Sequence, residues 1–301
     1  MRVRPDYIRF ASTIAAGLTM AAVAALVSMI LIFAAPALSK FGVGGVFSWV
    51  WAPYEGRFGI LPMLAGSLVL STATLFIAWP ASVAAACWRL AHRGAFAARA
   101  FHAIIRFMTA IPTVVYGFAA LFLLTPLVRE ALGGSGLCLL STSLTLTLLI
   151  IPTMVLVLES ALEPRLDELC PGGLALGMTR LELLWHFVFP ASKKPLLAAA
   201  LLGFGRAIGD TLLPLMLSGN SPHAPLTLTD SLRTLTAHMS LVTANEVGGS
   251  AYNSLFAAGA FLFVVNALVS LVARKMVKGR WLKSEGYKDE ELENKKQPAV
   301  V

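Results

Sequence analysis

The chain has 301 residues, of which 57% are hydrophobic and only 13% are charged. A soluble domain carries about 25% charged residues, so this composition excludes an ordinary soluble domain and indicates a membrane protein. The formal net charge is +8, but the lysines and arginines lie between long apolar runs. That placement is typical of membrane topology and excludes a soluble basic domain that binds nucleic acid. Three cysteines lie far apart in or beside apolar runs, so we interpret them as small buried side chains, not as a disulfide framework or a metal site.

Six apolar runs are long enough to cross a bilayer as helices, which need roughly 20 apolar residues each. They cover residues 11–38, 59–87, 107–127, 137–158, 196–217 and 252–272. The first run follows a basic start, but its 28 residues exceed the apolar core of a signal peptide, about 7–15 residues, so we interpret it as a span. The third run is expected to break at Ile111-Pro112 and at Tyr116-Gly117. The sequence therefore predicts an all-α integral membrane protein with six transmembrane helices and polar loops at residues 89–106 and 218–251.

The distribution of basic residues predicts the side on which each loop lies. The two termini and the connections after the second and fourth spans hold 19 of the 24 lysines and arginines, and the other three connections hold four. Loops rich in lysine and arginine stay in the cytoplasm. We therefore expect a multi-pass protein of the inner (plasma) membrane, with both termini and the connection at residues 159–195 in the cytoplasm.

A short amphipathic helix is predicted between residues 171 and 190, outside the membrane. Pro171 suits a helix start, where its missing N–H costs nothing. Apolar residues then recur at steps of four, three and four and make one stripe: Leu174, Met178, Leu181 and Trp185. Such a helix either lies on the bilayer surface or docks in a groove of another protein.

The fifth apolar run carries two charges, Arg206 and Asp210, although a charge inside a span costs about 3 kcal/mol. At a spacing of four on a helix the two side chains share one face. They are either a structural ion pair or an arginine on an anion path with its acidic counterweight. The guanidinium keeps its charge and matches phosphate oxygens, so we favour the anion path. Nearby residues predict a thinned or broken helix: Gly203, Gly205, Gly209 and Pro214.

The stretch ALGMTRLELLWHFVFPASKKPLLAAALLGFGRAIGD (residues 175–210) resembles the cytoplasmic signature of ABC importer permeases. That signature reads Glu-Ala-Ala, three residues, Gly, nine residues and Ile-x-Leu-Pro. Its glycine and its closing Ile, Leu and Pro fall on Gly177, Phe187, Phe189 and Pro190. Pro171-Gly172-Gly173 replaces the Glu-Ala-Ala, so the carboxylate of the motif is missing, with Glu168 close enough to substitute. The resemblance implies coupling to an ATPase through Leu174, Gly177, Met178, Thr179, Arg180, Leu181, Trp185 and Pro190.

Within that family the chain is most similar to PstC-type subunits of phosphate importers. The similarity rests on four stretches, residues 58–71, 107–122, 205–220 and 232–241. It implies a type I (MetI-like) permease fold over residues 59–275, after an N-terminal part at 1–58 with the first span and before a charged cytoplasmic tail at 276–301. It also links Arg206, Asp210 and Thr211 to the substrate pathway, although the family more often has Glu at position 210.

The resemblance implies the membrane subunit of an ATP-driven phosphate importer, with no cofactor. Its expected partners are a PstA-type permease, PstB-type ATPase subunits, an external PstS-type phosphate-binding protein, phosphate and the lipid bilayer. The chain has no phosphate-binding loop of the type GxxxxGK[ST] and no metal or nucleophile motif, so we do not expect an enzyme. Two alternatives stay open: a permease of the same fold for sulfate or molybdate, and a membrane scaffold or sensor that docks an ATPase without transport. The five histidines are interpreted as solvated or interfacial: His92, His102, His186, His223 and His238.

Overall fold

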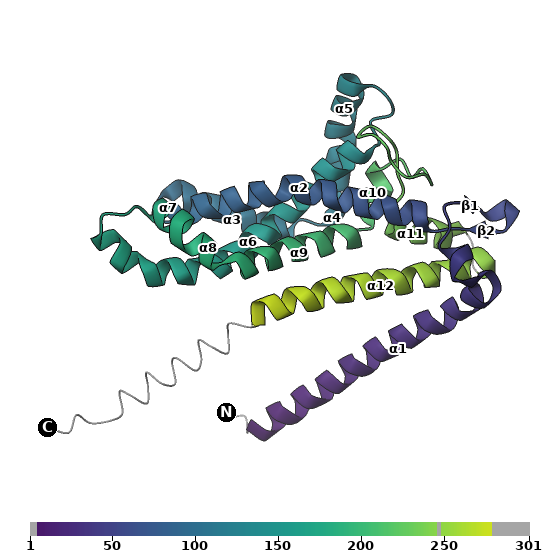
Figure 1. Ribbon diagram of the computed structural model, residues 1–301, viewed down its shortest axis with the longest axis horizontal. Helices are drawn as coiled ribbons and strands as arrows, with labels where there is room; N and C mark the ends of the chain where they lie inside the picture. The colour runs from purple at the N-terminus through teal and green to yellow at the C-terminus, as the bar shows by residue number, and fades with distance from the viewer. Residues whose placement is uncertain (1–4, 246–247, 279–301) are drawn as a thin grey trace.

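The computed structural model describes residues 5–245 and 248–278, and helices make up most of this part of the chain (Figure 1). The longer helices are α1 (Pro5–Val46), α2 (Leu61–Ala91), α3 (Phe96–Ala110), α6 (Leu139–Ala175), α9 (Lys193–Gly209), α11 (Leu235–Asn245) and α12 (Gly249–Lys278). The shorter ones are α4 (Thr113–Ala119), the π-helical η2 (Ala120–Leu124), α5 (Thr125–Leu132), α7 (Arg180–Leu183), the π-helical η3 (Leu184–Val188), α8 (Phe189–Ala191) and α10 (Leu212–Leu217). An antiparallel hairpin joins β1 (Trp51–Ala52) to β2 (Arg57–Phe58) through the 3-10 turn η1 (Pro53–Glu55). Of the expected tail at 276–301, all but the last turn of α12 lies outside the described residues.

Five helical segments among the described residues are long and apolar enough to cross a membrane: Ser12–Gly42, Leu61–Ala91, Thr113–Leu132, Leu139–Ala175 and Gly249–Val272. A sixth is counted if Arg180–Ala191 and Lys193–Gly209, which meet at an angle of 82°, are taken as one broken span. The expected all-α membrane fold is therefore confirmed. The expected fifth span at residues 196–217 is not one straight helix, because α9 and α10 are separate.

The core of the bundle lies where α2 packs against α6 and α9. Small and hydroxyl-bearing residues form the buried face of α2: Ser67, Ser71, Thr74, Ala78, Ser82 and Ala86. Membrane helices associate through such residues because small side chains let the main chains approach closely. The Thr147 hydroxyl of α6 donates a hydrogen bond to the Thr74 carbonyl of α2 across this contact, over 3.3 Å. The three cysteines are buried, which confirms the prediction of small buried side chains.

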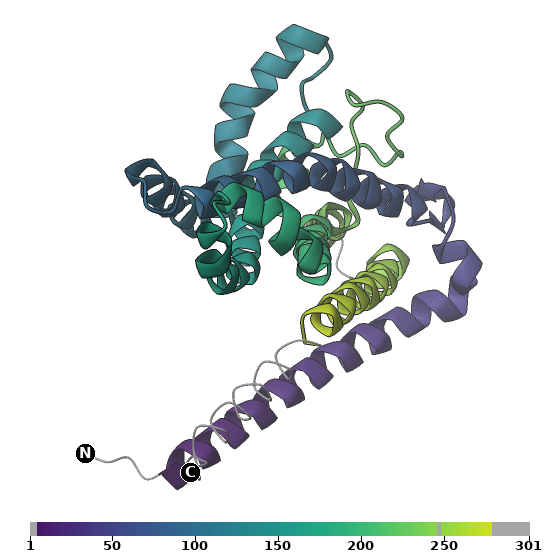
Figure 2. The same ribbon diagram turned by 60° about the vertical axis from the view of Figure 1, so that its left-hand side comes forward.

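Helices α1 and α12 lie side by side, as the second view shows (Figure 2), and α12 also packs against α9. Ala34 and Ala37 of α1 are buried, and the rings of Phe33 and Phe256 stack with their centroids 4.9 Å apart. Most other apolar side chains of α1 are exposed, which fits a span that faces lipid or a second membrane subunit.

The third span begins later than expected, because residues 96–110 form the separate amphipathic helix α3 within and beyond the predicted loop. The predicted break at Ile111-Pro112 is confirmed: Ile111 has an extended backbone, as residues before proline prefer. A break at Tyr116-Gly117 is wrong, since both residues lie inside α4. Tyr116 donates a hydrogen bond from its hydroxyl to the Met108 carbonyl of α3, over 3.0 Å. A Cβ atom on Gly117 would lie 2.6 Å from the Met216 sulfur, so glycine allows α4 to contact α10.

The connection at residues 218–251 is not only a polar loop, because it contains α11. Its first part is fixed to the start of α6 by two main-chain hydrogen bonds, from Leu139 N–H to the Asp230 carbonyl and from Leu140 N–H to the Leu228 carbonyl. The Ser218 hydroxyl donates to the Leu232 carbonyl, over 2.8 Å. This connection therefore packs on the bundle beside α10 and α11 (Figure 1).

Candidate functional site

The fifth span breaks at the charged residues that the sequence singled out. Helix α9 ends at Gly209, and Asp210 follows in an extended conformation, with φ −72° and ψ 134°. The Asp210 Oδ1 atom accepts a hydrogen bond from the Leu213 N–H, 3.0 Å away, at the start of α10. The Thr236 hydroxyl of α11 donates to the Asp210 carbonyl, over 2.8 Å. Asp210 therefore connects three elements at the break, and the predicted interruption of the helix is confirmed.

The expected direct pair of Arg206 and Asp210 is not formed in this structure. A spacing of four brings two side chains together only within one helix, and this helix ends between them. Arg206 is exposed on the last turn of α9 and makes no hydrogen bond or ion pair with any other described residue. Its guanidinium is thus available to an anion. Thr211, the third residue predicted for the pathway, lines a groove beside the break together with Gly209.

The helix predicted to begin at Pro171 does not exist as such, because α6 continues through Pro171 to Ala175. The chain then turns at Gly177, whose φ of +78° is favourable only for glycine. The Gly177 N–H donates to the Leu174 carbonyl and the Met178 N–H donates to the Gly173 carbonyl, both over 3.0 Å. This pair of bonds is a Schellman motif, so Gly177 is required for the turn that ends α6.

The next helical segment, α7, begins at Thr179 with a capping box. The Thr179 hydroxyl accepts from the Glu182 N–H, and the Glu182 carboxylate accepts from the Thr179 N–H. The Thr-x-x-Glu spacing is a signal for this start, so the predicted start at Pro171 is wrong. The helical run continues through η3 and α8 and bends at Ser192 into α9. Arg165 of α6 holds that bend through hydrogen bonds to the Ala191 carbonyl and the Ser192 hydroxyl.

The predicted apolar stripe is not one face of a single helix. Leu174 lies in α6, Met178 in the turn, Leu181 in α7 and Trp185 in η3. Leu174, Leu181 and Trp185 are nevertheless exposed, while the neighbouring Leu183, Leu184 and Val188 are buried against the bundle. Of the other predicted coupling residues, Arg180 begins α7 and Pro190 lies exposed in α8. We call residues 174–191 the coupling segment; it lies at one end of the molecule (Figure 1), and several of its apolar side chains are exposed.

Residues 78–280 match the family model described as "Binding-protein-dependent transport system inner membrane component". The chain belongs to this family. It is therefore the membrane permease subunit of an ABC importer, a transport subunit and not an enzyme, and its family works with an ATPase and a binding protein.

Several permeases are similar to this one along most of their length. The probable ABC transporter permease protein YqgH of Bacillus subtilis is 29% identical over 84% of this chain and 85% of its own. The phosphate transport system permease protein PstC of Haemophilus influenzae is 28% identical over 80% of this chain and 82% of its own. A probable PstC of Methanocaldococcus jannaschii is 26% identical over 82% and 85%. Among solved structures, the inward facing MetNI methionine ABC transporter covers 76% of this chain and 99% of its own at a TM-score of 0.54, with 16% identity, which shows the shared permease fold.

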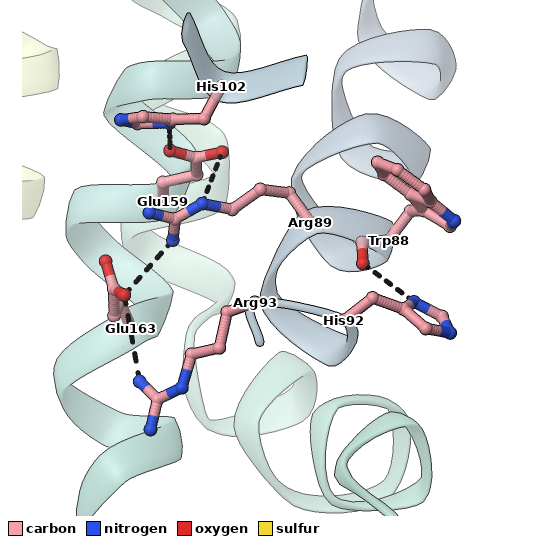
Figure 3. A network of polar contacts seen from close by, with 7 residues as sticks. All are labelled: Trp88, Arg89, His92, Arg93, His102, Glu159 and Glu163. Carbon is pink, nitrogen blue, oxygen red and sulfur yellow. Dashed lines mark hydrogen bonds and ion pairs between the residues drawn. The ribbon is translucent and has the colours of Figure 1, made fainter. Parts of the chain in front are cut away.

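The permease also contains a network of charged side chains that the sequence analysis missed (Figure 3). Arg89 at the end of α2 lies between two glutamates of α6, with its Nε 3.5 Å from Glu159 Oε1 and its Nη1 3.1 Å from Glu163 Oε1. His102 of α3 contacts the other oxygen of Glu159, over 2.9 Å. Arg93 pairs with Glu163 and with Asp167. The network joins α2, α3 and α6 at the end of the bundle that holds the coupling segment (Figure 1).

Two of the five histidines differ from the expected solvated or interfacial positions. His102 is largely buried in that network. His238 of α11 is fully buried against the Trp51 ring, with centroids 4.2 Å apart, and beside Arg233, whose Nη1 lies 3.5 Å from His238 Nδ1. The sequence around these two histidines has no periodic pattern that predicts their burial. His102 contacts Glu159 and His238 contacts Trp51, each more than 50 positions away, and the other contact of His238, Arg233, lies just before α11.

Proposed function

We propose that this permease translocates inorganic phosphate as the PstC-type subunit of an ATP-driven importer. The observation that carries the proposal is the exposed Arg206 guanidinium, which makes no hydrogen bond or ion pair with the described residues and lies next to a break in a membrane span. An unpaired positive charge at membrane depth is costly, so its presence indicates a pathway for an anion. The planar guanidinium can donate two parallel hydrogen bonds to phosphate oxygens. The several relatives named PstC support phosphate as that anion.

The coupling segment is the proposed docking site for a PstB-type ATPase in the cytoplasm. Its exposed Leu181 and Trp185 suit a groove of a partner protein better than open water. A Cβ atom on Gly173 would lie 2.3 Å from a methyl carbon of Leu183, so α6 and α7 are in close contact. With the Arg165 contacts to the bend before α9, this packing makes the segment a rigid lever. Movement of the ATPase would tilt α6 and α9 together and open Arg206 alternately to each side.

The remaining partners complete the proposed importer. A PstA-type permease would pair with this chain in the membrane, and a PstS-type protein would deliver phosphate to the side that carries the connection at residues 218–234. This arrangement requires both termini and the coupling segment in the cytoplasm, as the 19 basic residues there indicate.

Uptake measurements test the proposal directly. The gene is expressed with its neighbouring transporter genes in a bacterium that lacks other phosphate importers, and uptake of labelled phosphate, sulfate and molybdate is measured. We expect uptake of phosphate and none of the other two. Arg206→Ala should abolish it at normal membrane abundance, and Arg206→Lys should be poor because a point charge lacks the bidentate geometry. Normal phosphate uptake by Arg206→Ala would show that Arg206 is not part of the substrate pathway. Preferential uptake of sulfate or molybdate would show that phosphate is not the substrate.

A further inference from the structure

A groove of about 730 Å³ opens beside the break in the fifth span, between the end of α9 and helices α1, α11 and α12. Its lining is mostly apolar, but five polar side chains interrupt it: Thr211, Thr236, Ser240, Thr243 and Asn266. They come from three parts of the chain: the α9–α10 break, α11 and α12. Polar groups that converge from separate elements on one concave, largely apolar surface are typical of a ligand site.

Two of these five side chains are already satisfied by the main chain. The Thr236 hydroxyl donates to the Asp210 carbonyl and the Thr243 hydroxyl donates to the Met239 carbonyl, over 2.8 and 2.7 Å. Thr211, Ser240 and Asn266 make no side-chain hydrogen bond with any other residue that the structure describes. The groove therefore holds two hydroxyls and one amide with unused donors and acceptors.

Asn266 is the most informative of the three, because it lies in the middle of a membrane span. Its amide lies against Gly205 and Gly209 of α9, where added Cβ atoms would be 3.5 Å from its Oδ1 and 3.6 Å from its Nδ2. The two glycines are four residues apart and leave room for the amide on the surface of α9. An amide without a partner in a span is unfavourable, so a packing role alone does not explain it.

We propose that this groove is a binding site for the transported oxyanion, and that Asn266, Ser240 and Thr211 contact it. The inference rests on the proposed function, since it takes phosphate as that anion. Gly209 lines the groove and follows Arg206 by three residues on the last turn of α9, although the Arg206 side chain is not itself part of the lining. Arg206 supplies the charge, and the neutral groups supply hydrogen bonds without holding the anion too strongly for release. The Asn266 amide both donates and accepts, which suits phosphate because it carries hydroxyl and unprotonated oxygens.

The test compares two asparagines of α12 in the whole transporter. Asn266→Leu removes the amide from the groove, whereas Asn253→Leu makes the same change in α12 at a partly buried position outside the groove. We expect Asn266→Leu to lower phosphate uptake about tenfold or more, as loss of a hydrogen-bonding group in a ligand site does, at normal abundance and normal co-purification of the ATPase. Asn253→Leu should keep uptake within about twofold of the unmodified transporter.

A second variant and a second anion keep the outcomes separate. Ser240→Ala removes one hydroxyl with little change in side-chain volume and should lower phosphate uptake severalfold. If the Asn266→Leu protein does not insert into the membrane, Ser240→Ala alone tests whether the groove binds the anion. Normal uptake by Asn266→Leu, or by Ser240→Ala in that case, would overturn the groove as a binding site while phosphate transport stands. If the unmodified transporter instead takes up sulfate or molybdate, the phosphate assignment is wrong. Uptake of that anion by the same variants then tests whether the groove binds it.

Discussion

Asp210 caps helix α10 by accepting a hydrogen bond from the Leu213 N–H, with 3.0 Å between Oδ1 and the nitrogen. The first amides of a helix have no partner within the helix, so this carboxylate satisfies one of them. Its role at the break is therefore partly structural, and it does not depend on a direct contact with Arg206. The short side chain of Asp210 reaches the nearby main chain at the start of α10.

The cap predicts different outcomes for two substitutions of Asp210. Asp210→Asn keeps an oxygen that can accept from the Leu213 N–H, so we expect normal abundance but slower phosphate uptake, because the counter-charge to Arg206 is gone. Asp210→Ala removes the cap as well, at a cost of about 1 kcal/mol, and should lower the unfolding temperature of the purified complex. Thermal unfolding and uptake are measured on both variants. Equal unfolding temperatures for the Asn and Ala forms would show that the cap contributes nothing.

Gly177 and Gly172 offer a matched pair at the end of α6. Gly177 has φ +78°, which costs an alanine roughly 1–2 kcal/mol, whereas Gly172 is helical with open space around it. We expect Gly177→Ala to distort the turn into α7 and weaken ATPase co-purification and uptake. Gly172→Ala should leave both intact, since alanine favours the helix. The two variants are compared by affinity purification of the complex. Loss of the ATPase from both, or from neither, would contradict the role assigned to the turn.

The sequence predicted the features that depend on residues close together in the chain, and it did not predict contacts between residues far apart in the chain. Hydrophobic length identified the spans, and Pro112 and the glycines near Asp210 identified two breaks, because these signals are local. The continuation of α6 through Pro171 was missed, because proline is more frequent at the start of a helix than inside one, and here position 171 lies near the end of α6.

The candidate site divides in the same way. Arg206 was predicted from the sequence because a charged residue in an apolar run is visible without a structure, whereas Thr211 was predicted only through the resemblance. The network around Arg89 was not, because Arg89 and Glu159 are 70 positions apart and meet only when α2 packs against α6. Asn266 was likewise missed, because a single amide in the sixth span has no neighbouring motif.

The Arg89–Glu159 pair predicts a large effect for single substitutions and a small one for the double. The Glu159 side chain is only 4% exposed, so Arg89→Leu would leave a buried carboxylate with His102 as its remaining close partner. Breaking a buried pair costs about 3–5 kcal/mol, while replacing both partners with apolar residues is often neutral. We expect Arg89→Leu and Glu159→Leu to lower the unfolding temperature and Arg89→Leu/Glu159→Leu to restore most of it. A double variant as unstable as the sum of the singles would contradict the pairing.

The proposed orientation predicts opposite labelling of two exposed leucines. Leu226 lies in the connection at 218–234 and is 92% exposed, and Leu176 lies in the coupling segment and is 82% exposed. In intact cells a membrane-impermeant thiol reagent should label Leu226→Cys and should label Leu176→Cys only after the cells are opened. The native cysteines Cys87, Cys138 and Cys170 are buried, which keeps their background low. The reverse pattern would invert the topology and remove the coupling segment from the ATPase side.

His238 predicts that acid destabilises the layer formed by α11 and the β1–β2 hairpin. Burial, followed by the positive charge of Arg233, lowers the pKa of His238 to about 3, compared with 6.5 for an ordinary histidine. Between these two pH values the unfolded chain binds a proton that the folded chain does not. The free energy of unfolding is therefore unaffected by this group above about pH 6.5 and decreases as the pH falls below it, by about 2 kcal/mol at pH 5.

Unfolding temperatures of the purified complex at pH 7.5 and 5 measure the difference. His238→Gln, which removes the titrating group, should reduce the acid shift, whereas His223→Gln, at an exposed position in the neighbouring loop, should not. An unchanged acid shift in His238→Gln would show that His238 takes up its proton in the folded state as readily as in the unfolded chain.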